Sequence, residues 1–354
     1  MAATIRDVAA RAGVSVATVS RVVNRSPHRV SPATQRRVQA AVQALAYESN
    51  IIARGLKKRS TRSVALIVPD ISNPFFPAIA RGIEDVARAR GYAVLLCNTY
   101  EDLERERAYL DLLAKRMVDG LVFATAGSNT RHLRALRREG RPVVLVARDV
   151  AGVRIDTVLV DNFRGEFEAT THLLGLGHRR IAHITGPRSL HVASERRRGY
   201  LQALEAAGVP RSDAVIVEGD FAAEGGRQAV QHLLERGVRF TAVAAANDLM
   251  AIGAMEALRH AGRRIPQDVA VVGFDDITFA SLVSPALTTV AQPKYRMGQL
   301  AMERLLELMD GADEGGRQTV LIPQLVVRES CGARAAAGAI NGREESTRVG
   351  GGGG

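Results

Sequence analysis

A stretch near the N-terminus, residues 15–24, combines a capping hydroxyl with one apolar and one polar helix face. The Ser15 hydroxyl can accept a free backbone N–H and so begin a helix as its N-cap. Three valines fall on one face at helical spacing: Val19, Val22 and Val23. The remaining face carries small, polar or basic side chains: Val16, Ala17, Ser20 and Arg21. One face of this helix can therefore pack, and the other is available to read a partner.

The residues just before this stretch complete a recognisable motif. Thr4 and Asp7 have the spacing of a capping box that begins a helix over Ile5 to Ala12, which Gly13 ends in a tight turn. Two short helices joined by a glycine-containing turn form a helix-turn-helix, whose second helix enters the DNA major groove by its N-terminal residues. A small helical bundle without a partner is the alternative, because this pattern alone is unspecific.

A third helix and a linker follow. Ser31 and Pro32 cap a helix that ends near Tyr47, with apolar residues at helical spacing: Val38, Val42 and Leu45. The linker, residues 50–59, is apolar first and basic last, and it is too short to be a stable isolated helix. We expect it to order as a hinge helix only when a partner and DNA hold it.

The charge of the chain is concentrated in its first 62 residues. They carry twelve Arg or Lys residues against two acidic ones, a net charge of +10 out of +11 for all 354 residues. Such asymmetry indicates a nucleic-acid-binding head on a nearly neutral body, since phosphate contacts supply most of the affinity for nucleic acid. No signal peptide and no run of about 18 apolar residues is visible, so we expect a cytoplasmic protein. Cys97 and Cys331 are expected to be ordinary reduced thiols.

From Ser63 onward, apolar runs alternate with amphipathic helices. The runs that predict buried strands are 64–68, 92–96, 120–123, 143–146, 157–160, 181–184, 214–217, 242–245 and 269–272. The predicted helices are 75–90, 104–115, 130–138, 165–176, 194–207, 223–236 and 249–261. This alternation predicts two α/β lobes with parallel sheets. A short strand at 288–290, a helix at 295–309 and one strand at 320–327 could return to each lobe, and an Ala/Gly-rich tail follows from Cys331.

Nine collinear motifs resemble the lactose-repressor (LacI) family of bacterial transcription regulators. They are residues 4–9, 12–15, 18–24, 53–57, 68–76, 118–120, 177–181, 247–248 and 272–276, so the resemblance extends from residue 4 to about 329. It implies a three-helix helix-turn-helix DNA-binding head with a hinge helix, then a two-lobed periplasmic-binding-protein-like core of two parallel sheets flanked by helices. A homodimer on a pseudo-palindromic operator is the implied assembly.

The resemblance also implies which head residues touch DNA. Val16, Ala17 and Arg21 would meet base edges, with the guanidinium suited to guanine. Other positions would hold phosphates, the helix–turn geometry or the hinge: Thr4, Ser15, Thr18, Ser20, Asn24, Arg54 and Lys57. Leu56 resembles the family's leucine wedge, which kinks a central minor-groove step. Ser49 stands where Pro is frequent, and Gly55 lies inside the hinge helix at a cost of about 1 kcal/mol relative to Ala.

For the core, the resemblance implies an effector site between the lobes. The matching positions are Asn73, Phe75, Arg148, Asp161, Arg196, Phe221, Asn247, Asp275 and Gln292. Arg, Asp and Asn suit the paired hydroxyls of a sugar or nucleoside, and Phe suits an apolar ring face. Structural alternatives exist, since Asp161 can cap a helix, Asp275 can cap a turn and Phe75 can belong to the core. Ala147 stands where Asp is common in the family.

Other chemistry is not supported by the sequence. Four histidines at 172, 178, 183 and 191 lack metal-ligand spacing, and Gly175-Leu176-Gly177 lacks the context of a dinucleotide loop. No nucleophile elbow or phosphate loop is visible, so we expect neither an enzyme nor a metal or cofactor.

The expected organisation is a DNA-binding head at 1–48, a hinge at 49–62, a core at 63–330 and a disordered tail at 331–354. Within the core, lobe 1 would comprise about 63–161 and 291–318, and lobe 2 about 162–290 and 319–330. The expected function is a ligand-responsive repressor of a catabolic or transport operon, whose effector is a sugar, a sugar derivative or a nucleoside. The alternative is a solute-binding protein for sugar uptake, which would need a signal peptide.

Overall fold

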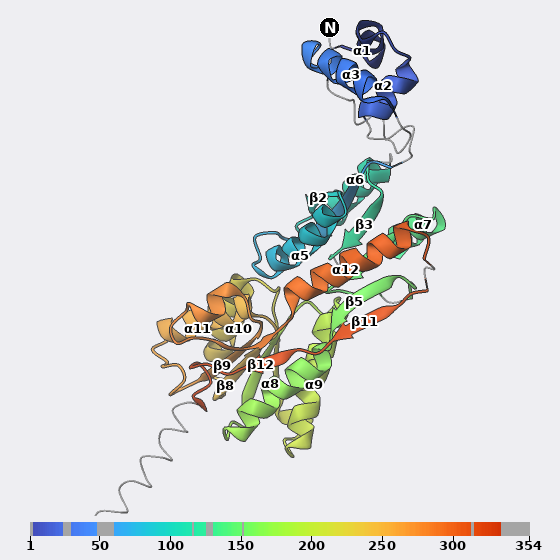
Figure 1. Ribbon diagram of the computed structural model, residues 1–354. Coiled ribbons are helices and arrows are strands. Elements are labelled where there is room, and N and C mark those ends of the chain that lie inside the picture. Colours follow the sequence, from blue (N-terminus) through green and yellow to red (C-terminus); the bar gives the residue numbers. More distant parts are fainter. Residues whose placement is uncertain are drawn as a thin grey trace, which may run out of the picture. The chain divides into compact units, whose positions relative to one another are not determined.

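The computed structural model describes residues 3–23, 30–47, 60–114, 117–124, 130–150, 152–312 and 315–333. The chain divides into two compact units, residues 1–62 and 63–354, which we call the head and the core (Figure 1). Asn24, the hinge residues 50–59 and the tail beyond 333 lie outside the described residues, so their expected roles stay predictions.

The described residues of the head form three short helices: α1 (Ile5–Ala12), α2 (Val16–Val23) and α3 (Pro32–Ala44). The predicted capping box is present, because the Thr4 side chain accepts from the Asp7 N–H while the Asp7 carboxylate accepts from the Thr4 N–H. Gly13 ends α1 with a positive φ of 63°, which glycine adopts without strain. The helices pack around a small apolar cluster: Val8, Ala9, Ala12, Val19, Val38 and Ala41.

Lobe 1 of the core is a six-stranded parallel sheet in the order β11-β5-β4-β3-β1-β2. The strands are β1 (Ser63–Val68), β2 (Ala93–Asn98), β3 (Gly120–Phe123), β4 (Val143–Val146), β5 (Asp156–Val160) and β11 (Gln318–Leu321). Successive residues of β1 pack on opposite faces of the sheet. Leu66 lies in the cluster with α5 (Phe75–Ala89) and α12 (Lys294–Met309), and Ile67 lies in the cluster with α6 (Leu103–Ala114) and α7 (Thr130–Arg138). Lobe 1 is therefore a three-layer sandwich.

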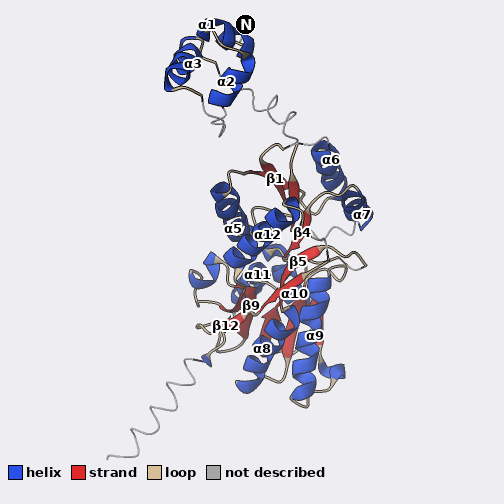
Figure 2. Ribbon diagram, turned by 45° about the vertical axis from the view of Figure 1, so that its right-hand side comes forward, coloured by secondary structure: helices blue, strands red, loops and turns tan. Residues whose placement is uncertain are grey.

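Lobe 2 repeats this arrangement with the strand order β12-β10-β9-β8-β6-β7. Its strands are β6 (Ile181–Thr185), β7 (Val215–Glu218), β8 (Ala242–Ala245), β9 (Ala270–Asp275), β10 (Thr288–Ala291) and β12 (Gln324–Val326), of which β12 runs antiparallel to β10. Its long helices are α8 (Asn162–Gly175) and α9 (His191–Ala206) on one face, and α10 (Ala223–Glu235) and α11 (Asp248–His260) on the other. Figure 2 shows strands of this lobe, among them β9 and β12, in red beside α8. Short 3-10 turns lie at Arg211–Asp213 and Thr278–Ser281.

The chain crosses between the lobes three times, after β5, after β10 and after β11. The first and third crossings lie side by side, because β5 and β11 are paired and the Asp161 N–H donates to the Leu321 carbonyl at 2.9 Å (Figure 1). Within the described residues, no helix has the length and apolar character needed to cross a membrane.

Three expectations about strands are wrong. The run 92–96 is not buried, because β2 is an edge strand with Leu95 and Leu96 38% and 48% exposed. The run 214–217 also forms an edge strand, and its side chains are only half-buried. The single strand expected at 320–327 is two strands in different sheets. Because Ile322 and Pro323 separate them, the lobe boundary falls after Leu321 rather than after residue 318.

Candidate functional site

Helix α2 presents one face to the head's core and the other to solvent. The Ser15 Oγ accepts from the Thr18 N–H at 3.1 Å and begins the helix, as the sequence predicts. Val19 is fully buried, and Val22 and Val23 pack against the same apolar cluster. The side chains of Val16, Ala17 and Arg21 are exposed, Val16 at 42%. The three side chains expected to read bases are therefore accessible on one helix.

Of the other head residues expected at DNA, the structure describes some and not others. Thr18 and Ser20 are half-buried, and the Thr4 hydroxyl donates to the Asp7 carboxylate at 2.8 Å. The hydrogen bonds from Thr4 hold the pKa of Asp7 below its ordinary value. Four further residues expected at DNA lie outside the described part of the chain: Asn24, Arg54, Leu56 and Lys57.

In the core, the effector residues lie where parallel strands end. Asn73 and Phe75 follow β1, Arg148 follows β4, Asp161 follows β5, Phe221 follows β7, Asn247 follows β8, Asp275 ends β9 and Gln292 follows β10. The carboxyl ends of parallel strands meet at one edge of each sheet, which is where α/β proteins bind ligands. The remaining residue, Arg196, reaches this edge from α9.

Arg196 is at the centre of the polar groups in lobe 2. Its Nε donates to the Asn162 Oδ1 at 2.9 Å, and its Nη1 donates to the Ala246 carbonyl. The same Nη1 lies 3.8 Å from the Asp275 Oδ1, and the guanidinium carbon lies 3.7 Å from the centre of the Phe274 ring. Only 6% of Arg196 is exposed, so its fork is fixed before any ligand arrives.

Asp275 accepts from the Gln292 Nε2 at 2.7 Å. Burial raises the pKa of Asp275, while the positive charges of Arg196 and Lys294 lower it.

The fully buried Asp248, which sequence reasoning missed, accepts from the Ile277 N–H at 2.8 Å and from the Thr289 hydroxyl. Burial raises the pKa of Asp248 well above its ordinary value, and the nearby Asp275 raises it further. The family motif at 247–248 was the sequence signal that could have identified Asp248.

A second buried group lies behind Arg196. Glu166 is one turn beyond Asn162 on α8, and its Oε1 lies 3.4 Å from the His183 Nδ1, which donates to the Ala244 carbonyl at 3.0 Å. Burial raises the pKa of Glu166 to about 8, although the charge of Arg196 opposes this. Burial lowers the pKa of His183 to about 3. Both side chains are therefore neutral near pH 7.

Asn247 and Phe221 are bound to each other. The Asn247 Nδ2 donates to the Phe221 carbonyl at 2.8 Å, and its Oδ1 accepts from the Met250 N–H at 2.9 Å, which caps α11. Phe221 has a positive φ of 66°, and its ring lies so close to Gly186 that a Cβ there would be 2.1 Å away. Asn247 thus holds the loop that carries Phe221, and Gly186 makes room for the ring.

The effector candidates of lobe 1 make contacts within their own part of the fold. The Asn73 Oδ1 accepts from the Phe75 N–H at 3.0 Å, and Phe75 is buried in the lobe 1 core. The Asp161 Oδ1 accepts from the Arg164 N–H at 2.9 Å and caps α8. Arg148 is buried, and its Nη1 donates to the Glu101 Oε1 at 2.8 Å. For Phe75 and Asp161 these contacts support the structural alternatives.

A hydrogen bond between His191 and Asp149 joins the lobes and was not foreseen. The His191 Nδ1 on α9 lies 2.8 Å from the Asp149 Oδ2 in lobe 1, and its Nε2 lies 3.7 Å from the Glu195 Oε1. Asp149 and His191 are 42 residues apart, so no local sequence signal linked them.

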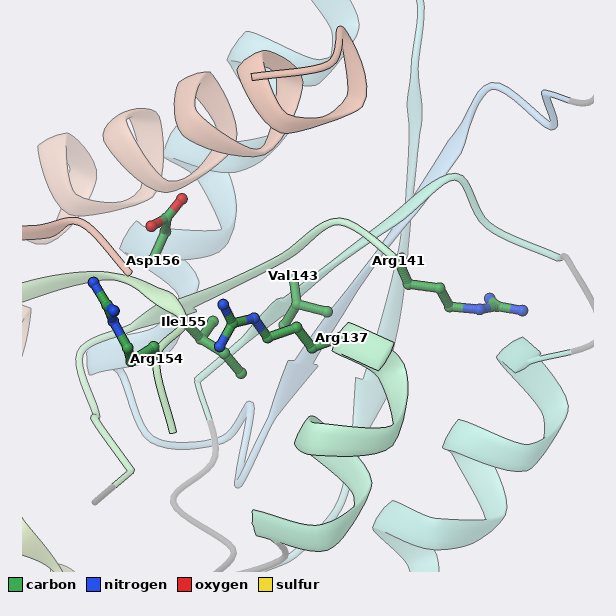
Figure 3. A pocket seen from close by; sticks show the side chains of 6 residues that line it. All are labelled: Arg137, Arg141, Val143, Arg154, Ile155 and Asp156. Atoms are coloured by element: carbon green, nitrogen blue, oxygen red, sulfur yellow. The ribbon is translucent and has the colours of Figure 1, made fainter. Parts of the chain in front are cut away.

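A small cavity in lobe 1 has a different character. It has a volume of about 10 Å³ and lies among Arg137, Arg141, Val143, Arg154, Ile155 and Asp156. Figure 3 shows Arg137 extending beside Ile155 and Arg141 extending away. The Asp156 carboxylate is already bonded to the Arg304 guanidinium and the Arg317 N–H. This space is the size of one water molecule and cannot hold a sugar.

A helix-turn-helix head joined to two α/β lobes, with polar groups at facing strand ends, defines a ligand-binding DNA regulator. Residues 4–50 match the family model described as bacterial regulatory proteins, lacI family. Residues 61–330 match the model for periplasmic binding proteins and the sugar binding domain of the LacI family. The chain belongs to the LacI family and is a DNA-binding transcriptional regulator.

Individual relatives cover almost the whole chain. The HTH-type transcriptional regulator DegA of Bacillus subtilis (strain 168) is 38% identical over 333 residues, 93% of this chain and 98% of DegA. The structure of the lac repressor dimer bound to operator and the anti-inducer ONPF has a TM-score of 0.83 at 31% identity, covering 94% of this chain and 99% of its own. A CelR–cellobiose complex has a TM-score of 0.72 at 36% identity, covering 93% and 99%. A solute-binding protein without a DNA function is not favoured.

Proposed function

We propose that this chain is a homodimeric repressor of a catabolic or transport operon, and that an effector bound between its lobes controls its hold on a pseudo-palindromic operator. The observation that carries the proposal is the exposed face of α2, where Val16, Ala17 and Arg21 project from a capped and packed helix. The Arg21 guanidinium would pair with a guanine edge, and the two small apolar side chains suit thymine methyls or a close approach to bases. Such a protein would act in the cytoplasm, where the DNA is.

The remaining head residues would position the protein without reading sequence. Thr4 before α1, Ser15 before α2, and Thr18 and Ser20 within α2 offer hydroxyls for phosphates. Asn24, Arg54, Leu56 and Lys57 keep the roles that the resemblance implies, with Leu56 as the minor-groove wedge.

Exposed apolar side chains supply surfaces for a second copy. In lobe 1, Leu95 and Leu96 on the edge strand β2 and Tyr100 after it are exposed. In lobe 2, Phe279 and Leu282 at the Thr278–Ser281 turn are 50% and 70% exposed. Neighbouring exposed apolar residues of this kind mark interaction surfaces. A two-fold dimer would match the symmetry of a pseudo-palindromic operator.

The effector class we propose is a sugar or a related small polar metabolite. Arg196 supplies fixed N–H donors, and Asp275 lies 3.8 Å away as an acceptor, a combination that fits two adjacent hydroxyls. The cellobiose bound by the similar CelR supports this class. A nucleoside, with a sugar and an apolar ring beside Phe221, is the second candidate.

The test is a band shift with DNA from the promoter region of the chain's own gene, at rising salt and with candidate effectors. We expect binding that weakens steeply with salt and changes with one effector. Thermal-shift screening of pentoses, hexoses, sugar acids and nucleosides supplies the effector. No binding, or binding insensitive to salt, would contradict the proposal.

A further inference from the structure

A larger cavity, of about 390 Å³, lies in lobe 2 at the end of the sheet opposite the effector residues. Its lining includes Arg180, Thr241 and Val269, which directly precede β6, β8 and β9. The effector residues of lobe 2 follow the carboxyl ends of the strands, whereas this cavity lies at their amino ends. We call it the amino-edge cavity, and it is separate from the proposed effector site.

Three arginines give this cavity a positive charge. The side chains of Arg180, Arg239 and Arg263 line it, are exposed, and have no hydrogen bond or ion pair with any residue that the structure describes. Guanidinium groups in this state keep their donors available for a ligand.

The carboxylate in the lining, Asp268, offsets these charges only in part, because its hydrogen bonds go to Arg264, although the charge of Arg263 also helps to lower its pKa. Asp268 accepts from the Arg264 N–H at 2.7 Å, from its Nε at 3.0 Å and from its Nη2 at 2.7 Å. These bonds hold the pKa of Asp268 well below its ordinary value, so it stays ionised and committed to Arg264. The three lining arginines therefore outnumber the carboxylates available to them.

The wall of the cavity is apolar. Leu234, Val238 and Phe240 line it, and the same three residues pack against the lobe 2 core, so this wall is fixed. The volume falls in the range of small-molecule sites, about 300–1,000 Å³. Arginine is the cation best suited to a phosphate group, because its planar fork donates two parallel hydrogen bonds.

From this arrangement we propose that the amino-edge cavity binds a small organic phosphate, with the phosphate on the three arginines and the organic part against the apolar wall. The site would act independently of the effector bound between the lobes. This assignment goes beyond the proposed function, since a repressor controlled only by the cleft has no need of it.

The experiment is titration calorimetry of the full-length protein with glucose 6-phosphate and adenosine monophosphate, beside glucose, adenosine and inorganic phosphate. We expect at least one ester to bind more tightly than its unphosphorylated form and than inorganic phosphate, and to bind less tightly as salt rises. Arg239→Gln and Arg263→Gln should each weaken this binding by at least about tenfold. Arg179→Gln, at an exposed arginine outside the lining, should leave it unchanged.

Three outcomes would overturn the proposal. If no ester binds, or inorganic phosphate binds equally well, the cavity is not a site for organic phosphates. If Arg196→Gln removes the binding and Arg239→Gln does not, the ester occupies the effector site instead. If the arginine variants lower the melting temperature without changing ester binding, these residues serve the nearby carboxyl ends of α10 and α11. Failure of operator binding would leave these results unaffected.

Discussion

The two arginines on which the proposed function depends differ in every respect except charge. The Arg21 side chain is exposed on α2 and bonds to no residue that the structure describes, whereas the Arg196 side chain is buried and bonds to Asn162 and Ala246 beside Asp275. A side chain that reads DNA can remain solvated until the partner arrives. A side chain that orients a small ligand is fixed in advance, because the ligand has too few contacts to order it. The head and the core should therefore respond to substitution in different ways.

Arg196→Gln should have the largest effect, on stability and ligand binding together. Removing the guanidinium leaves Asp275 buried without its ion-pair partner, which costs about 3–5 kcal/mol. Effector affinity should fall by more than about a hundredfold. Urea unfolding and calorimetry with the screened effector measure the two effects. Arg198→Gln, an exposed residue of the same helix, is the control and should change neither by much.

Glu166→Gln should remove a fall in stability at alkaline pH. Between pH 4.5 and about 8 the folded chain keeps a proton on Glu166 that the unfolded chain has lost, so stability decreases as the pH rises. His183 acts oppositely between about pH 3 and 6.5, because only the unfolded chain binds its proton there. The two effects offset each other between pH 4.5 and 6.5. Above pH 6.5, stability should fall by up to about 1.4 kcal/mol per pH unit until about pH 8.

The measurement is the free energy of unfolding in urea at pH 6.5 and 8, for wild type and variant. Glu168→Gln, at a half-buried position of the same helix where the carboxylate pairs with Arg164, should keep the wild-type pH dependence. An equal fall in Glu166→Gln and wild type would show that Glu166 is ionised in the folded chain.

Arg21→Ala should change DNA binding and leave stability unchanged. Loss of one bidentate contact to guanine costs about 1–3 kcal/mol, which is roughly tenfold to a hundredfold in operator affinity. Arg37→Ala removes the same charge from an exposed position of α3 and should weaken operator and non-specific DNA to the same small extent. Fluorescence anisotropy with both DNAs measures the ratio of operator affinity to non-specific affinity. If Arg21→Ala leaves this ratio unchanged, Arg21 does not read the DNA sequence.

His191→Ala should have the smallest effect. The His191 side chain is 55% exposed, so its bond to Asp149 contributes less than about 1 kcal/mol to stability. Because that bond joins the lobes, its loss should weaken effector binding by about fivefold or less. Calorimetry detects this change, with His232→Ala at an exposed position of α10 as the control. A loss above tenfold would mean that His191 contacts the effector itself.

The sequence predicted those parts of the structure that depend on interactions between residues close together in the chain. The Thr4–Asp7 capping box, the Ser15 cap and the apolar runs of the inner strands all depend on neighbouring residues. The exposure of β2 was not predictable, because a leucine-rich run gives no indication of whether strands lie on both sides of it. The helix-turn-helix and the two α/β lobes were predicted from capping residues, the glycine turn and the alternation of strands with helices, and the family motifs then made both assignments specific.

The candidate effector residues were found from the resemblance, but their contacts were not. Asn162 holds Arg196 and Asn247 holds the Phe221 loop through bonds between distant segments, which depend on how α8, α9 and α11 pack. Asp248 and Glu166 are buried carboxyl groups. The motif at 247–248 marks the position of Asp248 but not its burial, and nothing in the sequence neighbourhood of Glu166 distinguishes it from a surface acid. Burial is a property of the whole fold, and for that reason their altered pKa values needed the structure.

The paired crossings after β5 and β11 limit how the two lobes can move. The two segments lie side by side and are linked by the hydrogen bond from the Asp161 N–H to the Leu321 carbonyl, so they must bend together. They permit rotation about an axis across both segments and resist twisting, because twisting would shear that bond. An effector that changes the angle between the lobes must therefore bend these segments together with the third crossing after β10, and Ile322 and Pro323 lie in the segment between β11 and β12 that bends.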